Sequence, residues 1–176
     1  MRLRKNCQNG CVADSSTPPS SVGPLSHIGA RGAAHMVDVT AKAASERTAV
    51  AAGLLRTSAQ VVELISADGL AKGDALATAR VAGILAAKRT SELIPLCHQL
   101  ALTSVEVEFT VGGTDVNITA AVRSTDRTGV EMEALTAVCV AALTLYDMIK
   151  AVDPAARIDD IKVLRKEGGR HGTWVR

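Results

Sequence analysis

The residues best placed for chemistry lie in segment 128–153, TGVEMEALTAVCVAALTLYDMIKAVD. Glu131 and Glu133 stand near its start, and Asp147 and Lys150 stand near its end. The middle of the segment carries no charge. Carboxylates and an ammonium group can move protons or hold a charged substrate in place. Their position at the two ends of an otherwise apolar segment therefore needs an explanation.

A helix through this segment separates the two charged ends. Glu133 and Asp147 share one stripe of the helix but lie about 21 Å apart along its axis, so one small substrate cannot touch both in one chain. Asp147 and Lys150 are one turn apart and can pair. Either the two ends have separate tasks, or two chains bring unlike ends into one pocket. The alternative for Asp147 and Lys150 is a surface ion pair of little energy.

The start and the middle of the same helix carry further signals. Thr128 and Glu131 have the spacing of a capping box, which would give Glu131 a purely structural role. Glu133 has no such explanation, and the apolar residues around it suggest a mostly buried turn. The stretch AVCVAAL is small and apolar on every side, so both faces of the helix must be covered. We expect the sheet to cover one face and a second subunit to cover the other.

Three shorter stretches hold other candidates. Lys72 in AKGDALATAR precedes a helix start, where free N–H groups favour anions, although these residues alone favour an ordinary solvated lysine. Cys97 and His98 in IPLCHQL follow a helix break, where the histidine could move protons or serve as a satisfied core residue. KEGGRHGTW (166–174) suits a mobile phosphate loop but lacks the P-loop pattern. HMVDVTAK favours a polar turn rather than a site.

Composition limits the class of protein. The 176 residues are 47% hydrophobic but only 2% aromatic, so the core must consist of small aliphatic side chains. A net charge of +2 and few aromatic platforms argue against a nucleic-acid partner. No uncharged run reaches the ~18 residues of a membrane span, and no apolar core follows the basic start. The four cysteines do not form a disulfide framework, and no metal constellation occurs. We expect a cytoplasmic protein.

The chain divides into a tail and one domain. Residues 1–25 are rich in Ser and Pro and read as a disordered tail, and residues 26–176 form a single domain. The periodicity predicts strands at 47–57, 105–111, 116–123 and 158–166 and helices at 58–69, 72–94 and 129–152. Glu106 and Glu108 fall on the solvent side of their strand. This order predicts an α+β, ferredoxin-like fold, a four-stranded antiparallel sheet with helices packed on one face.

The motifs together resemble a known family. HMVDVTAK, KGDALATARVAGILAAKRTSELIPLCH and TGVEMEALTAVCVAALTLYDMIKAV are similar to the cyclic pyranopterin monophosphate synthase family, molybdenum cofactor biosynthesis protein C, over about residues 27–172. The resemblance implies a lyase that converts 3′,8-cyclo-7,8-dihydro-GTP to cyclic pyranopterin monophosphate and releases diphosphate. It implies no cofactor, a homohexamer built as a trimer of dimers with interface active sites, and a functional link to the radical GTP-cyclising enzyme.

The resemblance also assigns roles to residues. The implied catalytic residues are Asp147, Lys150, Lys72 and His98; the implied substrate-binding residues are Leu96, Cys97, His98, Glu131, Met132 and Glu133. One departure is Gln99, where the family pattern has proline. We expect Asp147 to hold a Lys150 of depressed pKa for proton transfer, and Lys72 to hold the triphosphate. His98 and Glu133 would orient the base or move a further proton. Two alternatives stay open: a nucleotide-sensing module and an oligomeric scaffold.

Overall fold

A computed structural model of the chain describes residues 32–67, 69–170 and 172–176. The predicted tail at 1–25 lies outside the described residues. The elements follow in the order β1 Ser45–Arg56, α1 Ala59–Ser66, α2 Ala75–Lys88, α3 Thr90–Leu93, β2 Leu102–Val111, β3 Asp115–Asp126, α4 Glu131–Ile149, β4 Arg157–Glu167 and β5 Trp174–Val175. The predicted α+β class and the predicted order of strands and helices are confirmed up to β4.

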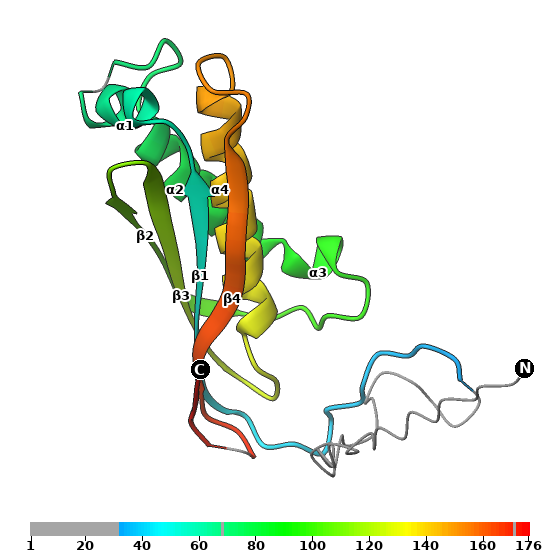
Figure 1. Cartoon of the computed structure of the whole chain (residues 1–176). Coiled ribbons are helices and arrows are strands. Elements are labelled where there is room, and N and C mark those ends of the chain that lie inside the picture. Colours follow the sequence, from blue (N-terminus) through cyan, green and yellow to red (C-terminus); the bar gives the residue numbers. More distant parts are fainter. Residues whose placement is uncertain (1–31, 68, 171) are drawn as a thin grey trace, which may run out of the picture.

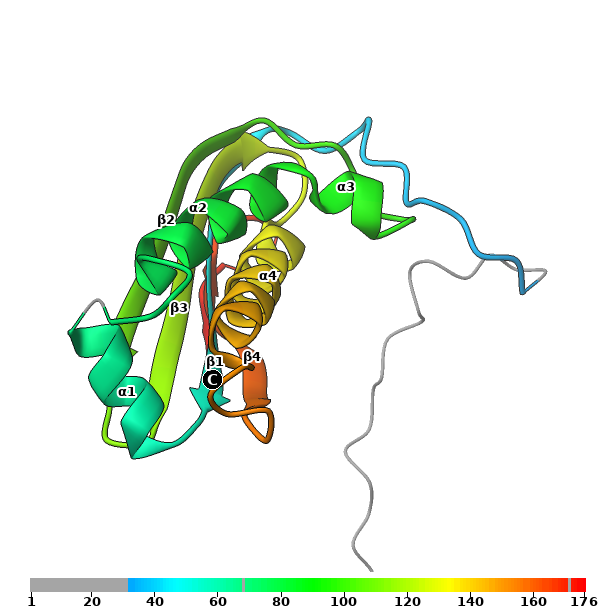
Figure 2. The same ribbon diagram turned by 90° about the horizontal axis from the view of Figure 1, so that it is seen from above.

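The strands form one sheet in the order β2-β3-β1-β4-β5, and each neighbouring pair is antiparallel. The prediction of four strands is wrong, because β5 adds a fifth at the edge beside β4. Two residues are too few for an alternating pattern, so the sequence carries no strand signal there. The helices cover one face of the sheet, as Figure 2 shows from above.

α4 is the central helix of the covering layer. It packs against β1, β3 and β4, while α2 packs against α4 and β2 (Figure 1). The layers approach closely because two positions lack a side chain. A Cβ on Gly83 of α2 would lie 2.9 Å from the main-chain oxygen of Ala137, and a Cβ on Gly53 of β1 would lie 2.7 Å from Val138. Both distances are shorter than real Cβ contacts, so alanine-sized side chains would separate the layers.

The long helix predicted at 72–94 is divided in two. α2 begins after Asp74, whose Oδ1 accepts a hydrogen bond from the Ala77 amide at 2.9 Å, so Asp74 is the N-cap of this helix. The helix breaks at Arg89, where φ is −111° and ψ is 13°. Ile94 has an extended backbone, as the residue before Pro95 prefers. The short α3 therefore ends just before Pro95, close to the predicted helix end at residue 94.

The predicted capping box of α4 is wrong. The helix begins at Glu131, its N-cap is Val130, and no side chain caps it. The Glu131 carboxylate instead pairs with the Lys166 ammonium of β4, Oε1 to Nζ 2.9 Å. The Glu131 carboxylate, which a capping box would need at the helix start, is thus paired with a lysine of another element. Thr128 lies outside the helix. Glu133 is buried as expected, at 4% exposure.

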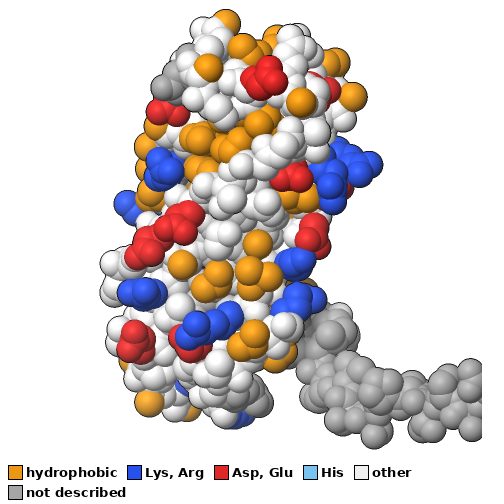
Figure 3. All heavy atoms as spheres, turned by 60° about the vertical axis from the view of Figure 1, so that its left-hand side comes forward, with side chains coloured by type: hydrophobic (Ala, Val, Ile, Leu, Met, Phe, Trp, Pro, Cys, Tyr) orange, Lys and Arg blue, Asp and Glu red, His pale blue; other side chains and the backbone are white. Residues whose placement is uncertain are grey.

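The outer side of α4 carries exposed apolar residues, and Leu143 is 57% exposed. Among the described residues α4 alone has the length and apolar composition to cross a membrane, but half of it is buried inside the fold, as a core helix would be. Figure 3 shows one face of the molecule, where hydrophobic patches alternate with Lys, Arg, Asp and Glu. Glu106 and Glu108 on β2 are exposed, as predicted.

Candidate active site

Three charged residues meet near the C-terminal end of α4. Asp147 accepts hydrogen bonds from two lysines, from Lys72 Nζ to Oδ2 at 2.7 Å and from Lys150 Nζ to Oδ1 at 2.7 Å. Lys72 Nζ also lies 2.7 Å from the main-chain oxygen of Asp147. Lys72 reaches this point from the turn that precedes α2, because α2 and α4 pack side by side. The predicted Asp147–Lys150 pair is confirmed, and Lys72 joins it.

The charges of this cluster reinforce one another. Hydrogen bonds from Lys150 and then Lys72 lower the pKa of Asp147 to about 2. The hydrogen bond to Asp147 raises the pKa of Lys150. The expectation of a depressed Lys150 pKa is therefore wrong for the single chain. The lysine side chain is about half exposed, so its partner's negative charge outweighs the small cost of burial.

A second group of candidate residues lies near the start of α4. Burial raises the pKa of Glu133, and the Glu131 charge raises it further. Burial also raises the pKa of the Cys97 thiol, and the charge of Glu133 adds to that rise. The two side chains are therefore within electrostatic reach of each other. Leu96 is half-buried on the same loop, and Met132 is 37% exposed on α4.

His98 anchors the chain that precedes β1. Its Nε2 lies 2.8 Å from the main-chain oxygen of Val37, which accepts the hydrogen bond. The carboxylate of Asp38, the residue after Val37, accepts hydrogen bonds from the Thr40 hydroxyl and from the Thr40 amide, the latter at 2.8 Å. Both hydrogen bonds lower the pKa of Asp38. HMVDVTAK thus contains a polar turn, as predicted. Its last residues, Ala41 and Lys42, also line the cavity described next.

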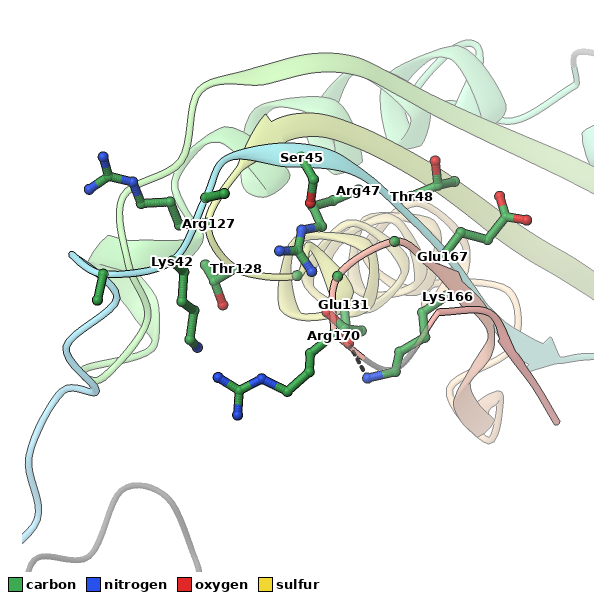
Figure 4. Close-up of a pocket in the computed structure, with 15 residues that line it drawn as sticks. Lys42, Ser45, Arg47, Thr48, Arg127, Thr128, Glu131, Lys166, Glu167 and Arg170 are labelled. Carbon is green, nitrogen blue, oxygen red and sulfur yellow. Dashed lines mark hydrogen bonds and ion pairs between the residues drawn. The ribbon is translucent and has the colours of Figure 1, made fainter.

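A cavity of about 680 Å³ opens beside the start of α4. Four segments line it: residues 41–48, residues 127–131, the end of β4 and the glycine-rich stretch that follows (Figure 4). Its cationic residues are Lys42, Arg47, Arg127, Lys166 and Arg170, against the carboxylates of Glu131 and Glu167. The Glu131 carboxylate forms an ion pair with Lys166. The cationic residues outnumber the carboxylates, so the cavity has a net positive charge that favours an anion.

The sheet register brings these cations together. Arg47 lies opposite Ser124 of β3, and the next residue, Thr48, lies opposite Glu167 of β4. Arg47 is held in place by a hydrogen bond from its Nε to the main-chain oxygen of Asp126, 3.3 Å. In Figure 4 the side chains of Lys42, Arg47 and Arg170 point into the same space from three different segments.

The glycine-rich stretch approaches Arg47 very closely. A Cβ on Gly169 would lie 1.6 Å from Arg47 Nη1, and φ at this residue is 77°. At Gly168, where φ is 88°, an added Cβ would lie 2.0 Å from the main-chain oxygen of Glu46. Only glycine fits both the conformation and the space. The phosphate-loop signal in KEGGRHGTW thus coincides with the rim of a cationic cavity.

The structure keeps the two ends of α4 apart within one chain. The Lys72–Asp147–Lys150 cluster is at one end; Glu131, Glu133 and the cationic cavity are at the other. Arg47 and Arg127 are cavity residues that the sequence reasoning missed. No motif marks them, because each stands at the end of an ordinary strand, and only the pairing of β1 with β3 and β4 makes them neighbours. Within the described residues no three His, Cys, Asp or Glu side chains form a group that could hold a metal.

Comparison with known proteins identifies the family. The model of the MoaC family matches residues 36–169. The chain belongs to the MoaC family. Cyclic pyranopterin monophosphate synthase 2 from Mycobacterium tuberculosis is 80% identical over 154 residues, which cover 88% of this chain and 92% of that protein. Cyclic pyranopterin monophosphate synthases from Streptomyces coelicolor (57% identity; 86% of this chain, 89% of that protein) and Corynebacterium efficiens (58%; 85% and 97%) are also similar.

The matched range contains the motifs of the MoaC family resemblance except His35, the first residue of HMVDVTAK. Both the lysine–aspartate cluster and most of the cationic cavity fall inside residues 36–169. Arg170 and the strand β5 lie just beyond it. The resemblance stated from the motifs is therefore confirmed at the level of the family.

Proposed function

We propose that this chain is a cyclic pyranopterin monophosphate synthase, a lyase of molybdenum cofactor biosynthesis. Its substrate would be 3′,8-cyclo-7,8-dihydro-GTP, and its products cyclic pyranopterin monophosphate and diphosphate. The observation that carries the proposal is the 80% identity, over 88% of the chain, to a protein of that name. An exposed cluster of two lysines on one carboxylate and a cationic cavity provide chemistry that this reaction needs.

The cavity would bind the polyphosphate. Its cations come from β1, the β3–α4 turn, the end of β4 and the glycine stretch, and together they can surround a chain of phosphates. Guanidinium groups such as those of Arg47 and Arg170 suit phosphate oxygens because their N–H groups form paired hydrogen bonds. Neutralised in this way, diphosphate becomes a good leaving group when the cyclic phosphate forms. This assignment moves the main triphosphate contact from Lys72 to the cavity.

The lysine–aspartate cluster would act on the purine-derived part of the substrate. The pKa of Asp147 is lowered to about 2 and the pKa of Lys150 is raised, so Lys150 can donate a proton. The ammonium groups of both lysines can stabilise developing negative charge. Removal from water by substrate and a neighbouring subunit lowers a lysine pKa and makes proton return easier. Both sets of assignments stay parts of this proposal. The catalytic residues are Lys72, Asp147, Lys150 and His98, and the substrate-binding residues are Leu96, Cys97, His98, Glu131, Met132 and Glu133.

A complete site then requires two chains. The lysine–aspartate cluster and the cavity stand at opposite ends of α4, whose 19 residues span about 28 Å. We propose that dimers within a homohexamer, a trimer of dimers, place the cluster of one chain beside the cavity of another. Exposed apolar residues such as Leu143 of α4 and Leu85 of α2, each more than half exposed, support a surface that another chain covers.

Three further assignments belong to this proposal. The sheet follows the ferredoxin-like plan, and the enzyme works in the cytoplasm. It is functionally linked to the radical enzyme that supplies the cyclised nucleotide.

Product formation tests the proposal directly. The protein is incubated with 3′,8-cyclo-7,8-dihydro-GTP, and released diphosphate and the pterin are measured. Wild-type turnover is expected, and Lys150→Ala should lose it while keeping the oligomer, as judged by size-exclusion chromatography. Lys88→Ala, an exposed lysine at the end of α2, is the matched control and should retain activity. A nucleotide-sensing module would bind the substrate and release nothing, and a scaffold would also release no diphosphate; either result rejects the proposal. Full turnover by Lys150→Ala would instead remove Lys150 from the mechanism.

A further inference from the structure

The C-terminal residues are fastened to the edge of the sheet beside the cationic cavity. Trp174 pairs with Lys166, and Val175 pairs with Arg165. The Arg176 amide donates to the main-chain oxygen of Leu164 at 2.9 Å. The Arg176 Nε donates to the main-chain oxygen of Val163 at 2.8 Å. A strand of only two residues is thus held by backbone pairing and by one arginine side chain.

Trp174 stands on the same side of the sheet as Lys166. Directly opposite residues of antiparallel strands have Cβ atoms about 4.5–5.5 Å apart, so the indole lies beside the stem of that lysine. Trp174, Val163, Lys166 and Glu131 line a shared hollow next to the cavity. The Arg176 guanidinium lies 5.5 Å from the centre of the Trp174 ring, a cation–π contact that favours one orientation of the indole.

Between the paired ends lies the stretch that carries Arg170. Gly168, Gly169 and Gly172 all have positive φ. Glycine gives this backbone the close approach to Glu46 and Arg47, but it also leaves the loop little conformational restraint of its own. The position of Arg170 must therefore be set by the two anchors, β4 on one side and β5 on the other. Figure 4 shows Arg170 directed into the space shared with Lys42 and Arg47.

The anchor adds little to the core. Trp174 is 40% exposed and Val175 is 64% exposed, and neither belongs to the buried cluster formed by the helices and the sheet. The only tryptophan of the sequence thus keeps its ring partly in solvent, where it contacts the Arg176 guanidinium and lines a hollow with Lys166 beside the cationic cavity. This arrangement serves the position of the loop more than the free energy of unfolding.

We propose that Trp174, oriented by Arg176, is a positioning residue for polyphosphate binding: it holds Lys166 and the Gly168–Arg170 backbone where they converge with Arg47. The inference rests on the proposed function, because it deepens the role of the same cavity. Trp174 touches no phosphate itself; it acts through Lys166 and Arg170. Loss of the ring therefore weakens substrate binding and leaves the lysine–aspartate cluster at the other end of α4 intact.

The test compares Trp174→Ala with Trp174→Phe and with Val175→Ala, its neighbour on the opposite side of the strand. Steady-state kinetics use 3′,8-cyclo-7,8-dihydro-GTP, and calorimetric titration uses inorganic triphosphate. Trp174→Ala should raise both KM and the triphosphate Kd about tenfold, the loss of one charge-assisted contact. The value of kcat should fall less than KM rises, because Trp174 acts on the cavity and not on the lysine–aspartate cluster. Trp174→Phe should recover most of the affinity, and Val175→Ala should match wild type.

Folding is monitored by circular dichroism and thermal melting of the full chain. If Trp174→Ala does not fold, Arg176→Ala provides the test. This variant keeps the ring but removes the cation–π contact and the hydrogen bond to the main-chain oxygen of Val163, and a rise in Kd of about threefold is expected. Unchanged KM and Kd in the folded variants, or an equal effect of Val175→Ala, would overturn the positioning role. Absence of turnover in wild type would instead reject the proposed function, and the triphosphate titration would still decide the role of Trp174.

Discussion

Lys72 and Asp147 are 75 positions apart, yet the lysine Nζ lies 2.7 Å from both the carboxylate Oδ2 and the main-chain oxygen of Asp147. Together with Lys150 this contact gives one carboxylate two ammonium partners. The arrangement joins the turn before α2 to the last turn of α4. Its energetic and catalytic consequences can be tested separately.

Removal of the Asp147 charge should reduce stability in a pH-dependent way. The folded pKa of about 2 lies below the ordinary 3.8, so ionised Asp147 stabilises the fold above pH 3.8. That contribution disappears as the pH falls through 2. We expect Asp147→Asn to melt slightly below wild type at pH 7 and to match it at the acid end of the range. Glu63→Gln, an exposed carboxylate on α1, is the control; a constant Asp147→Asn deficit at all pH values contradicts the prediction.

Lys72 should affect both the Asp147 carboxyl and turnover. Because a Lys72 hydrogen bond helps to lower the pKa of Asp147, Lys72→Ala should raise that pKa, measured by carboxyl NMR. Loss of a positioned proton donor should reduce kcat about 100-fold or more. Lys88→Ala should alter neither quantity. An unchanged Asp147 pKa in Lys72→Ala would show that the contact does not persist in solution.

Glu133 should have the opposite pH behaviour to Asp147. Burial raises its pKa above the ordinary 4.5, so folding favours the protonated carboxyl and stability falls as the pH rises above 4.5. Glu133→Gln removes this cost. The variant should melt above wild type at pH 8, and the advantage should shrink toward pH 4. Glu108→Gln, on the exposed side of β2, should show no such gain, and the same lack of gain in Glu133→Gln would refute the idea.

Gly83 should tolerate no larger side chain. Its Cα faces the main-chain oxygen of Ala137 and the Cβ of Ala141, and a Cβ there would already be 2.9 Å and 3.3 Å away. Gly83→Val should therefore lower the free energy of unfolding by about 1–3 kcal/mol through overpacking. Urea denaturation measures the loss. Gly113→Val, in the β2–β3 turn with open space around it, is the control. Equal stability of the two variants would mean that α2 can move away from α4 at little cost.

Arg47 should contribute to binding of inorganic triphosphate. Its side chain lies in the cationic cavity and contacts the Gly169 backbone. Arg47→Gln should weaken triphosphate binding about tenfold, and the loss should shrink at high salt. Arg89→Gln, an arginine at the surface beyond α2, serves as the control. Equal affinities of the two variants would place the polyphosphate elsewhere.

The local elements could be read from the sequence because their signals are short-range. Alternation in β2 and β3, the Asp74 cap of α2 and the extended residue before Pro95 all depend on neighbours a few positions away. The break at Arg89 and the strand β5 could not be read. No glycine or proline marks the break at Arg89, while β5 depends on its pairing with β4 and is too short to show a pattern. The capping box failed because of a distant contact as well, since Lys166 is 35 positions from Glu131.

The part of the candidate site that depends on local helix geometry, the Asp147–Lys150 pair, could also be predicted from the sequence. Asp147 and Lys150 pair because a helix places residues three apart on one side, a relation fixed by chain geometry alone. The motifs also determined the family, since they stand contiguous in the chain. The tertiary structure alone decided that Lys72 shares Asp147, that Arg47 and Arg127 join Lys166 and Arg170 around one cavity, and that Lys150 has a raised pKa. Those outcomes depend on sheet register, on the packing of α2 against α4 and on solvent exposure, which no local run of residues encodes.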